Sequence, residues 1–339
     1  MSKATISDVA KYCQVSTATV SMVLTNKGRI STKTRARVLA AIDELGYIYN
    51  QSAANLRHKR SNLVGLLIPD ITNPFYAELI AGLSHYLEAH DSLLFLANTE
   101  DNVAKQNKLI ESLIGQNAGG LVLCPSKETD ISFLETVKKR GIPIVLAVRP
   151  MVDESFDYVG TNSFMGVQMA TEHLIKLGHR HIAFIGGAVN SQTRSHRLGG
   201  YMSKLLEYGI YPRENYIVSC GASRAEGATA AHKLLQQHPE ITAVIAYQDI
   251  VAFGVMRAAK GMGLVVGKDI AVVGFDDVPD AADTSPSLTT VSVSAQQIGL
   301  AAGELLLTKM AGNSDGTKSL VFPPKLIIRQ SCGTPNTSQ

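Results

Sequence analysis

Residues 5–24 read TISDVAKYCQVSTATVSMVL and predict two short helices joined by a tight turn. From Ile6 onwards the apolar side chains of the first half recur at the spacing of one helix face. Ser16 is a preferred N-cap for a second helix, which we expect over Thr17–Leu24. The small side chain of Ala10 allows the two helices to cross closely. The stretch therefore predicts a helix-turn-helix unit.

A third helix is expected directly afterwards. Ser31 is its N-cap, apolar residues from Val38 to Leu45 share one face, and Gly46 supplies the C-terminal stop. In a helix-turn-helix the second helix enters the major groove of DNA, and hydroxyls at helix N-termini meet phosphate. The candidate base-reading residues are Thr17, Ala18, Ser21 and Met22, and the candidate phosphate contacts are Ser16, Thr19, Ser31 and Thr34. A small three-helix domain that binds nothing is the alternative that spacing alone leaves open.

Charge is distributed unevenly along the 339 residues. Residues 1–60 carry ten Lys and Arg side chains against three Asp and Glu, whereas the whole chain has a net charge of +3. The remaining residues are therefore mildly acidic. A basic first segment on an acidic body is typical of a protein whose first segment meets phosphate groups. A solvated lysine-rich face is the other interpretation that charge permits.

From residue 62 onwards, short apolar runs alternate with amphipathic helices, which predicts parallel, doubly wound sheets. About seven such units are too many for one sheet, so we expect two Rossmann-like lobes. The expected domains are a helical domain over 1–48, a linker over 49–61, a two-lobed α/β domain over 62–332 and a tail over 333–339. The predicted strands are Leu63–Ile68, Leu93–Ala97, Gly120–Leu123, Ile142–Ala147, Ile182–Ile185, Thr242–Ala246 and Ile270–Gly274, with a last apolar piece at Lys325–Ile328.

Several functional classes lack their signatures in this sequence. The four Cys residues are scattered and form no CxxC pair, and the glycine pairs complete no phosphate-binding loop. We therefore expect no cofactor, no metal site and no catalytic residue. The N-terminus lacks the apolar region of a signal peptide, and there is no run of about 18 apolar residues. We expect a cytoplasmic, nucleoid-associated protein without a membrane partner.

Longer motifs connect both parts of the chain to one family. They are Val15-Ser16-x-x-Thr19-Val20-Ser21, Ile30-Ser31-x-x-Thr34-Arg35, Leu45-Gly46-Tyr47, Asn73-Pro74-Phe75-Tyr76, Gly274-Phe275-Asp276-Asp277 and Leu288-Thr289-Thr290-Val291. On these motifs the sequence resembles the LacI/GalR family over essentially its whole length. The resemblance implies a helix-turn-helix domain followed by a periplasmic-binding-protein-like domain. It also implies a repressor of a carbohydrate-utilisation operon of the maltose or α-glucoside type, controlled by a small sugar or sugar-phosphate effector.

The resemblance further implies roles on DNA for individual residues. Thr17, Ala18 and Met22 take the main base-reading positions, while Thr5 and Arg29 reach the duplex. Residues 52–59 form a hinge helix that wedges into the minor groove, where the cost of unstacking is offset because bent DNA touches more of the protein. The residues expected there are Ala53, Leu56 and Arg57. Two positions depart from the family pattern: Gln14 replaces a usual Gly, and Tyr49 replaces a usual Pro.

The effector candidates are polar residues that follow strands, because ligands of open α/β sheets bind at the carboxyl ends of strands. Carboxylate, amide and guanidinium groups suit a polyol, with an aromatic face for its ring. The residues themselves point to Asp70, Asn73, Arg149, Asp249 and Asp276, with Phe75 and Tyr76 as the aromatic face, and the resemblance adds Thr193 and Arg197. Asp70 and Asp249 can instead cap helices, and Phe75 can be core. Thr161-Asn162 and Gln248-Asp249 depart from the usual family pairs.

The resemblance implies a two-state switch in which the effector sets DNA affinity. We expect a homodimer, because a palindromic operator mirrors a two-fold protein. No leucine heptad follows Ser331, so we expect no tetramerising helix. Two rival interpretations remain: a Rossmann-like enzyme with an incidental helical head, which would need a cofactor fingerprint, and a sugar-binding transport protein, which would need a signal peptide.

Overall fold

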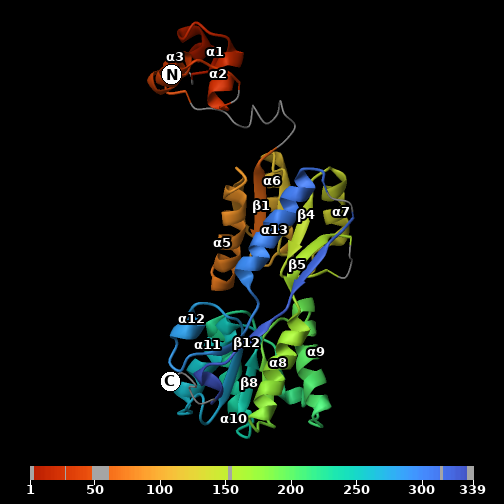
Figure 1. Cartoon of the computed structure of the whole chain (residues 1–339). Coiled ribbons are helices and arrows are strands. Elements are labelled where there is room, and N and C mark those ends of the chain that lie inside the picture. Colours follow the sequence, from red (N-terminus) through yellow and green to blue (C-terminus); the bar gives the residue numbers. More distant parts are fainter. Residues whose placement is uncertain (1–3, 27, 48–60, 152–154, 314–315, 334–339) are drawn as a thin grey trace. The chain divides into compact units, whose positions relative to one another are not determined.

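The computed structural model describes residues 4–26, 28–47, 61–151, 155–313 and 316–333. The chain separates into two compact units, residues 1–61 and 62–339 (Figure 1). Three helices make up the described part of the first unit, here called the head: α1 (Ile6–Tyr12), α2 (Thr17–Leu24) and α3 (Thr32–Leu45). The predicted bounds of α2 are confirmed. The predicted hinge helix and the tail after residue 333 lie outside the described residues.

Side-chain caps begin the head helices as the sequence predicts. Ser16 Oγ accepts the backbone N–H of Thr19 at 3.1 Å, and Ser31 Oγ accepts that of Thr34 at 3.2 Å. The turn between α1 and α2 places Gln14 at φ 49°, in the left-handed region that suits glycine. The head helices bury one small core, whose residues are Val9, Ala10, Cys13, Val20, Val23, Val38 and Ala41.

The second unit consists of two lobes that repeat one sheet topology (Figure 1). The strand order is β11-β5-β4-β3-β1-β2 in the N-lobe and β12-β10-β9-β8-β6-β7 in the C-lobe. The N-lobe strands are β1 (Leu63–Ile68), β2 (Leu93–Asn98), β3 (Gly120–Leu123), β4 (Ile144–Ala147), β5 (Asp157–Thr161) and β11 (Ser319–Phe322). The C-lobe strands are β6 (Ile182–Ile185), β7 (Ile217–Val218), β8 (Ala243–Ala246), β9 (Ala271–Asp276), β10 (Thr289–Ser292) and β12 (Lys325–Ile327).

Helices cover both faces of each sheet, as the predicted doubly wound architecture requires. The N-lobe helices are α5 (Pro74–Glu88), α6 (Val103–Gly115), α7 (Ile131–Lys139) and α13 (Ala295–Met310). The C-lobe helices are α8 (Ser163–Lys176), α9 (Gln192–Glu207), α10 (Arg224–Gln237), α11 (Asp249–Gly261) and the short α12 (Asp280–Asp283). Alternate residues of β1 divide between two cores, since Leu66 packs on the side of α5 and Leu67 on the side of α6.

Helices α5 and α13 approach closely because each has a glycine at the contact. A Cβ added to Gly82 would lie 2.0 Å from the carbonyl oxygen of Gln296, and one added to Gly299 would lie 2.0 Å from that of Leu79. Larger residues cannot occupy either position without separating the two helices. This contact ties the C-terminal helix α13 back onto the N-lobe, although most of the intervening chain belongs to the C-lobe.

The chain passes between the lobes three times, from β5 to α8, from β10 to α13 and from β11 to β12 (Figure 1). These crossovers bring the carboxyl ends of the parallel strands of both sheets towards each other. In an α/β sheet, ligands bind at this edge, where the strand order reverses. The reversal lies between β1 and β3 in the N-lobe and between β6 and β8 in the C-lobe.

The seven predicted strands are all present, but four further strands were missed. These are β5, β7, β10 and β11, which are short or polar. The apolar piece at Lys325–Ile328 forms β12, which runs antiparallel to β10 and so departs from the predicted all-parallel arrangement. The carboxyl-terminal chain reaches it directly from β11 in the other lobe, without a crossover helix, and a parallel pairing would need such a connection.

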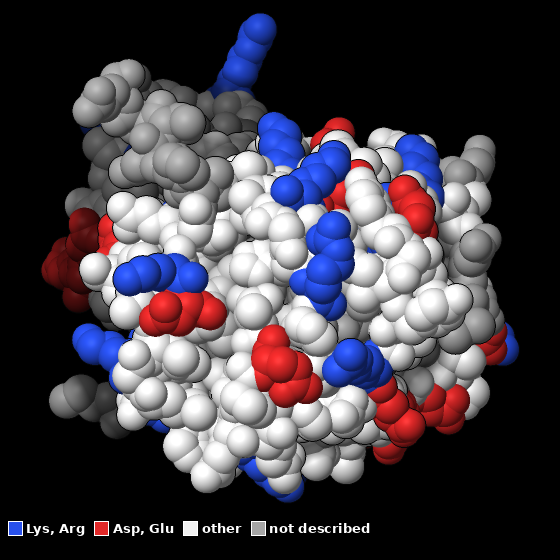
Figure 2. Space-filling view, turned by 90° about the horizontal axis from the view of Figure 1, so that it is seen from below, with Lys and Arg blue, Asp and Glu red and all other residues white. Residues whose placement is uncertain are grey.

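The end of the C-lobe away from the crossovers carries positive and negative side chains that are interspersed (Figure 2). Ion pairs such as Lys176–Glu172 and Lys204–Glu207 lie at the ends of α8 and α9. That face therefore presents no field of one sign. Among the described residues, no helix is both long enough and apolar enough to cross a bilayer.

Candidate functional site

The four predicted base-reading side chains lie on the accessible part of α2. Thr17 and Ala18 are exposed, and Ser21 and Met22 are partly exposed, whereas Val20 is buried in the head core. Hydroxyl groups can donate to or accept from base edges, and methyl groups can contact the thymine methyl. This part of the helix surface is therefore chemically suited to a DNA groove.

The N-termini of α2 and α3 are suited to phosphate. Neither helix has an acidic residue in its first turn, so the partial positive charge of the helix end is not compensated. The hydroxyls of Ser16 and Thr19 lie 2.9 Å apart at the start of α2, and those of Ser31 and Thr34 lie 2.9 Å apart at the start of α3. Each pair combines a capping oxygen with a second hydroxyl at an open helix end.

The start of α1 differs from the other two. Asp8 occupies its first turn, and the hydroxyl of Thr5 donates to that carboxylate at 2.6 Å within a capping box. Thr5 is exposed but already engaged, so its contact with a duplex would compete with the cap. Arg29 is exposed on the segment before α3. The predicted contacts Ala53, Leu56 and Arg57 lie outside the described residues.

In the second unit, Arg197 forms the centre of a buried polar cluster in the C-lobe. It lies in the first half of α9 and is 4% exposed. Its guanidinium carbon lies 3.7 Å from the ring centroid of Phe275 and 4.6 Å from that of Tyr247. Nη2 lies 3.6 Å from Asp276 Oδ1, and Nη1 donates to the backbone carbonyl of Tyr247. The arginine is therefore fixed by two rings, a carboxylate and a carbonyl group.

Three buried polar atoms beside this arginine lack a partner. Arg197 Nε, Gln248 Oε1 and Asp276 Oδ2 make no hydrogen bond to any of the residues that the structure describes. An unpaired buried polar group costs about 1–3 kcal/mol. One of these atoms is a donor and two are acceptors, and neighbouring hydroxyls of a polyol can serve both kinds. The set therefore matches a ligand with several hydroxyl groups.

Burial raises the pKa of Asp276 to about 8, although the adjacent guanidinium of Arg197 acts in the opposite direction. Asp249 is fully buried, and burial raises its pKa to about 6. Asp249 accepts hydrogen bonds from the hydroxyl of Thr290 at 2.5 Å and from the backbone N–H of Val278 at 2.9 Å. Its contacts hold the chain after β9 in place, which supports a structural role rather than direct ligand contact.

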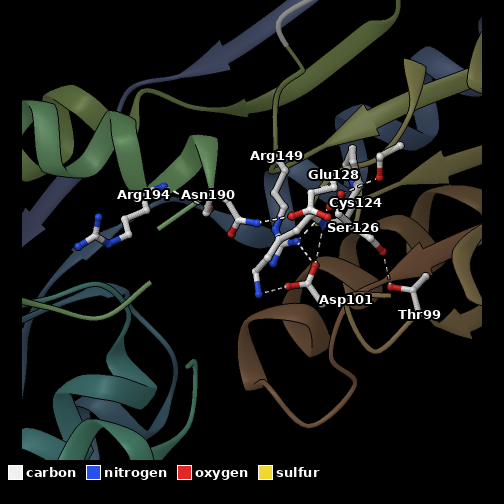
Figure 3. A network of polar contacts seen from close by, with 12 residues as sticks. Thr99, Asp101, Cys124, Ser126, Glu128, Arg149, Asn190 and Arg194 are labelled. Carbon is white, nitrogen blue, oxygen red and sulfur yellow. Dashed lines mark hydrogen bonds and ion pairs between the residues drawn. The ribbon is translucent and has the colours of Figure 1, made fainter. Parts of the chain in front are cut away.

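The N-lobe side of the cleft contains a half-buried ion-pair network (Figure 3). Asp101, from the loop after β2, lies 2.6 Å from Arg149 Nη1 and 2.7 Å from Lys127 Nζ. Arg149 also donates to the carbonyl oxygen of Pro125 at 3.0 Å. Burial raises the pKa of Asp101, but Arg149 and Lys127 more than offset this effect and leave the pKa below its ordinary value. Asp101 is therefore a carboxylate at neutral pH.

A cavity of about 660 Å³ lies between the two lobes. Its lining comes from the loop after β3, the segment after β4 and the start of α9, and it includes Arg149 and Thr193. One hydrogen bond spans the lobes at this cavity, from Asn190 Nδ2 to Glu128 Oε1 (Figure 3). A second cavity of about 450 Å³ also contains Thr193 in its wall. The predicted residues Arg149 and Thr193 thus come together from different lobes.

The other predicted effector residues lie at the start of α5. Asp70 Oδ1 accepts the backbone N–H and the hydroxyl of Thr72, and Asn73 Oδ1 caps α5 by accepting the N–H of Phe75 at 3.0 Å. Phe75 and Tyr76 are 3% and 4% exposed and contact each other edge to face. Asp70 therefore stabilises the turn before α5, while Asn73 and not Asp70 caps the helix, and the two aromatic rings are largely core.

Strained backbone positions concentrate in the loops of this cleft. Asp101, Glu128, Val148, Asp276 and Asp277 all have positive φ. Val148, with φ 67°, is the least favourable because it is β-branched. Such positions cost about 1–3 kcal/mol each and cluster at ligand sites. Their presence in four different loops supports the interlobe cleft as the functional site of this unit.

Sequence reasoning missed four residues that shape the cleft. Asp101, Lys127, Glu128 and Asn190 were not among the candidates, although all four follow predicted strands by a few residues. The rule that selected Asp70 would also have selected Asp101. The pairing of Glu128 with Asn190 joins residues 62 positions apart, and no local pattern indicates it.

Comparison with known proteins places both units in one family. The model of bacterial regulatory proteins of the lacI family matches residues 5–50, and the model of periplasmic binding proteins and the sugar binding domain of the LacI family matches residues 61–330. The chain is 33% identical over 335 residues to the maltose regulon regulatory protein MalI of Escherichia coli (strain K12), covering 96% of this chain and 98% of that protein. It is 34% identical over 329 residues to the ribose operon repressor of Halalkalibacterium halodurans (strain ATCC BAA-125 / DSM 18197 / FERM 7344 / JCM 9153 / C-125), covering 96% of each.

Solved structures agree with this assignment. The lac repressor dimer bound to operator and the anti-inducer ONPF matches with a TM-score of 0.84 and 27% identity, over 98% of this chain and 99% of that one. The transcriptional regulator CelR in complex with cellobiose matches with a TM-score of 0.75 and 29% identity, over 97% of this chain and 99% of that one. These proteins are regulators and not enzymes. The chain therefore belongs to the LacI family of bacterial DNA-binding transcriptional regulators.

Proposed function

We propose that this regulator represses a carbohydrate-utilisation operon and that a saccharide in the interlobe cleft controls its affinity for the operator. The three unpaired atoms at Arg197, Gln248 and Asp276 are the observation that carries the effector assignment. They combine one donor with two acceptors among buried side chains, and paired hydroxyls supply both functions. Arg149 and Thr193 face the same ligand from opposite lobes.

The head reads the operator through α2 in this proposal. Thr17, Ala18, Ser21 and Met22 contact base edges, while the hydroxyls at the starts of α2 and α3 and the side chain of Arg29 contact the backbone. Thr5 and the hinge residues Ala53, Leu56 and Arg57 complete the contact set. The support for this assignment is the exposure of the α2 residues and the open helix N-termini.

The effector acts by changing the balance between two lobe arrangements. A ligand shifts that balance only if it binds one arrangement more tightly. The hydrogen bond between Asn190 and Glu128 holds the lobes together beside the cavity, so a ligand that replaces it or adds to it has a differential effect. The lobe arrangement then sets the separation of the two hinge segments in a dimer.

A homodimer is the proposed assembly, in keeping with the lac repressor dimer among the structural matches. The edge strand β2 supplies a surface for a second copy, because Leu93 and Phe95 are 55% and 51% exposed and Leu96 and Ile71 are also exposed. Apolar side chains on an unpaired edge strand are normally covered by a partner. A second copy of the chain covers this edge.

Maltose and related α-glucosides are the first effectors to test, because MalI is among the relatives that match nearly the whole chain. The regulator acts in the cytoplasm on nucleoid DNA, where its operator lies. No cofactor or metal takes part in this proposal. Thr161 and Gln248 depart from the usual family residues, and in this proposal they determine which sugar binds.

An electrophoretic shift assay tests the proposal. The full chain is titrated onto duplexes from upstream of its own gene and of neighbouring carbohydrate genes, with and without saccharides, and onto random duplex. We expect a preferred duplex, an affinity that falls steeply with added salt, and a change in affinity with one saccharide. Deleting residues 1–61 should abolish the shift. Equal affinity for all duplexes, in every saccharide, would contradict the proposal.

A further inference from the structure

The interlobe cavity contains charged groups of both signs, and their pairing bears on the sugar or sugar-phosphate alternative. Four charged residues line it: Lys127 and Arg149 are cations, and Glu128 and Asp130 are carboxylates. A phosphorylated sugar needs an unpaired cation, an open helix N-terminus or both. Whether a carboxylate already pairs with each positive group therefore decides whether a phosphate can bind there.

Both cations of the cavity wall are already paired with one carboxylate. Asp101 lies 2.7 Å from Lys127 Nζ and 2.6 Å from Arg149 Nη1, and it also accepts the backbone N–H of Lys127 at 3.1 Å. Together with Asp101, the cavity has two cations and three carboxylates. A phosphate group would enter a site of net negative charge and would share both cations with Asp101.

Both helix N-termini at the cavity also have carboxylates. Asp130 is the N-cap of α7, and its Oδ1 accepts the backbone N–H of Ser132 at 2.9 Å. At α9 the first turn has no acidic residue, but Glu128 hydrogen-bonds Asn190, which directly precedes the N-cap Ser191. A carboxylate thus already caps α7, and at α9 the carboxylate of Glu128 contacts the residue just before the N-cap, where it repels an anionic ligand.

The cations deeper in the C-lobe offer no further site for a phosphate. Arg197 is held by Asp276 and by two aromatic rings. Arg194 donates through Nε to the carbonyl oxygen of Gly186 at 3.0 Å, and Figure 3 shows its guanidinium pointing away from Arg149 and Asp101. It is not among the residues that line the interlobe cavity.

We infer that the effector of this regulator is a saccharide that carries no phosphate or carboxylate group. The inference rests on the proposed function and narrows its ligand class. Hydroxyl groups bind this cavity without disturbing an ion pair, whereas an anionic group competes with Asp101 for Lys127 and Arg149 and is repelled by the carboxylates of Asp101, Glu128 and Asp130. The cavity thus selects against the phosphorylated form of a sugar whose uncharged form it accepts.

Calorimetric titration of the full chain with matched ligand pairs tests the inference. The pairs are glucose with glucose 6-phosphate, maltose with maltose 6′-phosphate, and methyl α-glucoside with the corresponding glucuronide. In each pair of which at least one member binds, we expect the uncharged member to bind at least tenfold more tightly than the charged member. Tighter binding of the charged member by the wild-type chain would overturn the inference, and the proposed function would still stand. If no saccharide bound or changed operator affinity, the proposed function itself would fail.

Two variants locate the cause of the discrimination. Asp101→Asn leaves Lys127 and Arg149 without their carboxylate, so the charged ligand should gain at least tenfold relative to its uncharged partner. Asp130→Asn removes the same unit charge from the same cavity and retains a capping oxygen, so it measures the effect of charge alone. Equal shifts in the two variants would overturn the role of Asp101. If Asp101→Asn does not fold, as checked by circular dichroism, the wild-type comparison still decides the inference.

Discussion

The head and the cleft present opposite kinds of candidate residue. On α2, Thr17 and Ala18 are exposed and take no part in the head core. In the cleft, Arg197 and Asp276 are 4% and 6% exposed and contact each other and their neighbours. Under the proposed function, the head therefore separates stability from recognition, since its core and its proposed reading surface use different residues. In the cleft, by the same proposal, the same residues carry both properties.

This difference has a physical basis in what each ligand offers. DNA is large and charged, so small side chains on a rigid helix suffice once the backbone contacts have positioned the head. A saccharide is small and well hydrated, and a protein competes with water for it only by burying preorganised polar groups. Substitutions should consequently affect stability and binding together in the cleft and separately in the head.

The largest effect is expected from Arg197→Met. At about pH 9, where Asp276 is ionised, the variant leaves that carboxylate buried without its cation, and removing one partner of a buried pair costs about 3–5 kcal/mol of unfolding free energy. The saccharide response of operator binding should disappear as well. Denaturant unfolding and the shift assay with saccharide measure the two losses.

Arg194→Met is the matched control for this substitution. Arg194 lies on the same helix and is 8% exposed, but it contacts a carbonyl oxygen and an aromatic ring where Arg197 meets a carboxylate. Its loss should cost about 1–2 kcal/mol, the range of one hydrogen bond plus packing. Equal losses of unfolding free energy in the two variants would contradict the prediction that Arg197 contributes both to stability and to saccharide binding.

In the head, Thr17→Ala should weaken operator binding without destabilising the fold. The loss of one contact to a base edge costs about 1–3 kcal/mol of discrimination, while binding to random duplex stays unchanged. Unfolding free energy should change by less than about 0.5 kcal/mol, as for other exposed positions. Titration of operator and random duplex, together with denaturant unfolding, checks both statements.

Thr25→Ala provides the comparison at the other end of α2. The Thr25 hydroxyl donates to the carbonyl oxygen of Ser21 at 2.8 Å, and the residue is exposed. It lies away from the helix N-terminus, so operator affinity should hardly change. A larger loss of operator affinity for Thr25→Ala than for Thr17→Ala would mean that the C-terminal end of α2, and not its N-terminal part, contacts the operator bases.

The pH dependence of saccharide binding sharpens the comparison on the cleft side. Burial raises the pKa of Asp276 to about 8, so the free protein is partly protonated there at neutral pH. A sugar hydroxyl donates to the ionised carboxylate, and binding must therefore release a proton. Affinity should fall about fivefold as the pH drops from 8 to 7.

Calorimetry in two buffers of different ionisation enthalpy measures this proton release directly. Asp276→Asn should bind more weakly and lose the pH dependence over this range. Proton uptake on binding, or an affinity that rises as the pH falls, would show that the carboxylate does not accept from the ligand. Operator binding without saccharide serves as the reference at each pH.

Local sequence signals predicted the head almost completely. Ser16 and Ser31 cap their helices as expected, and Gly46 ends α3 in the left-handed conformation. Capping and turn preferences depend on neighbours within four residues, so the sequence contains the whole signal. The long apolar strands of the lobes were found for the same reason, since each carries its own burial pattern.

The cleft was predicted less well because its contacts are not local. The segments DYVGT at β5 and TTVS at β10 have few apolar residues, and only the neighbouring strands make them part of a sheet. Asp70 and Asp276 each lie two residues after a predicted strand, yet one stabilises a turn and the other, as the last residue of β9, faces an arginine. Residue type and position relative to a strand are the same for both, so only the fold distinguishes them.

The smallest predicted effect concerns the turn of the head. Gln14 adopts φ 49°, and a left-handed conformation costs a non-glycine residue about 1 kcal/mol. Gln14→Gly should therefore stabilise the head by at most about 0.6 kcal/mol, once the greater freedom of glycine in the unfolded chain is subtracted. Hydrogen exchange of the α1 and α2 amides in the full chain would show slower opening.

Asn26→Gly is the control, because Asn26 also has positive φ but accepts a hydrogen bond from Arg35 at 2.6 Å, so glycine should bring no gain there. Since Gln14 lies in the turn and not among the reading residues of α2, operator specificity should stay constant while stability rises. A change in specificity would mean that stability and recognition are coupled in the head as they are in the cleft.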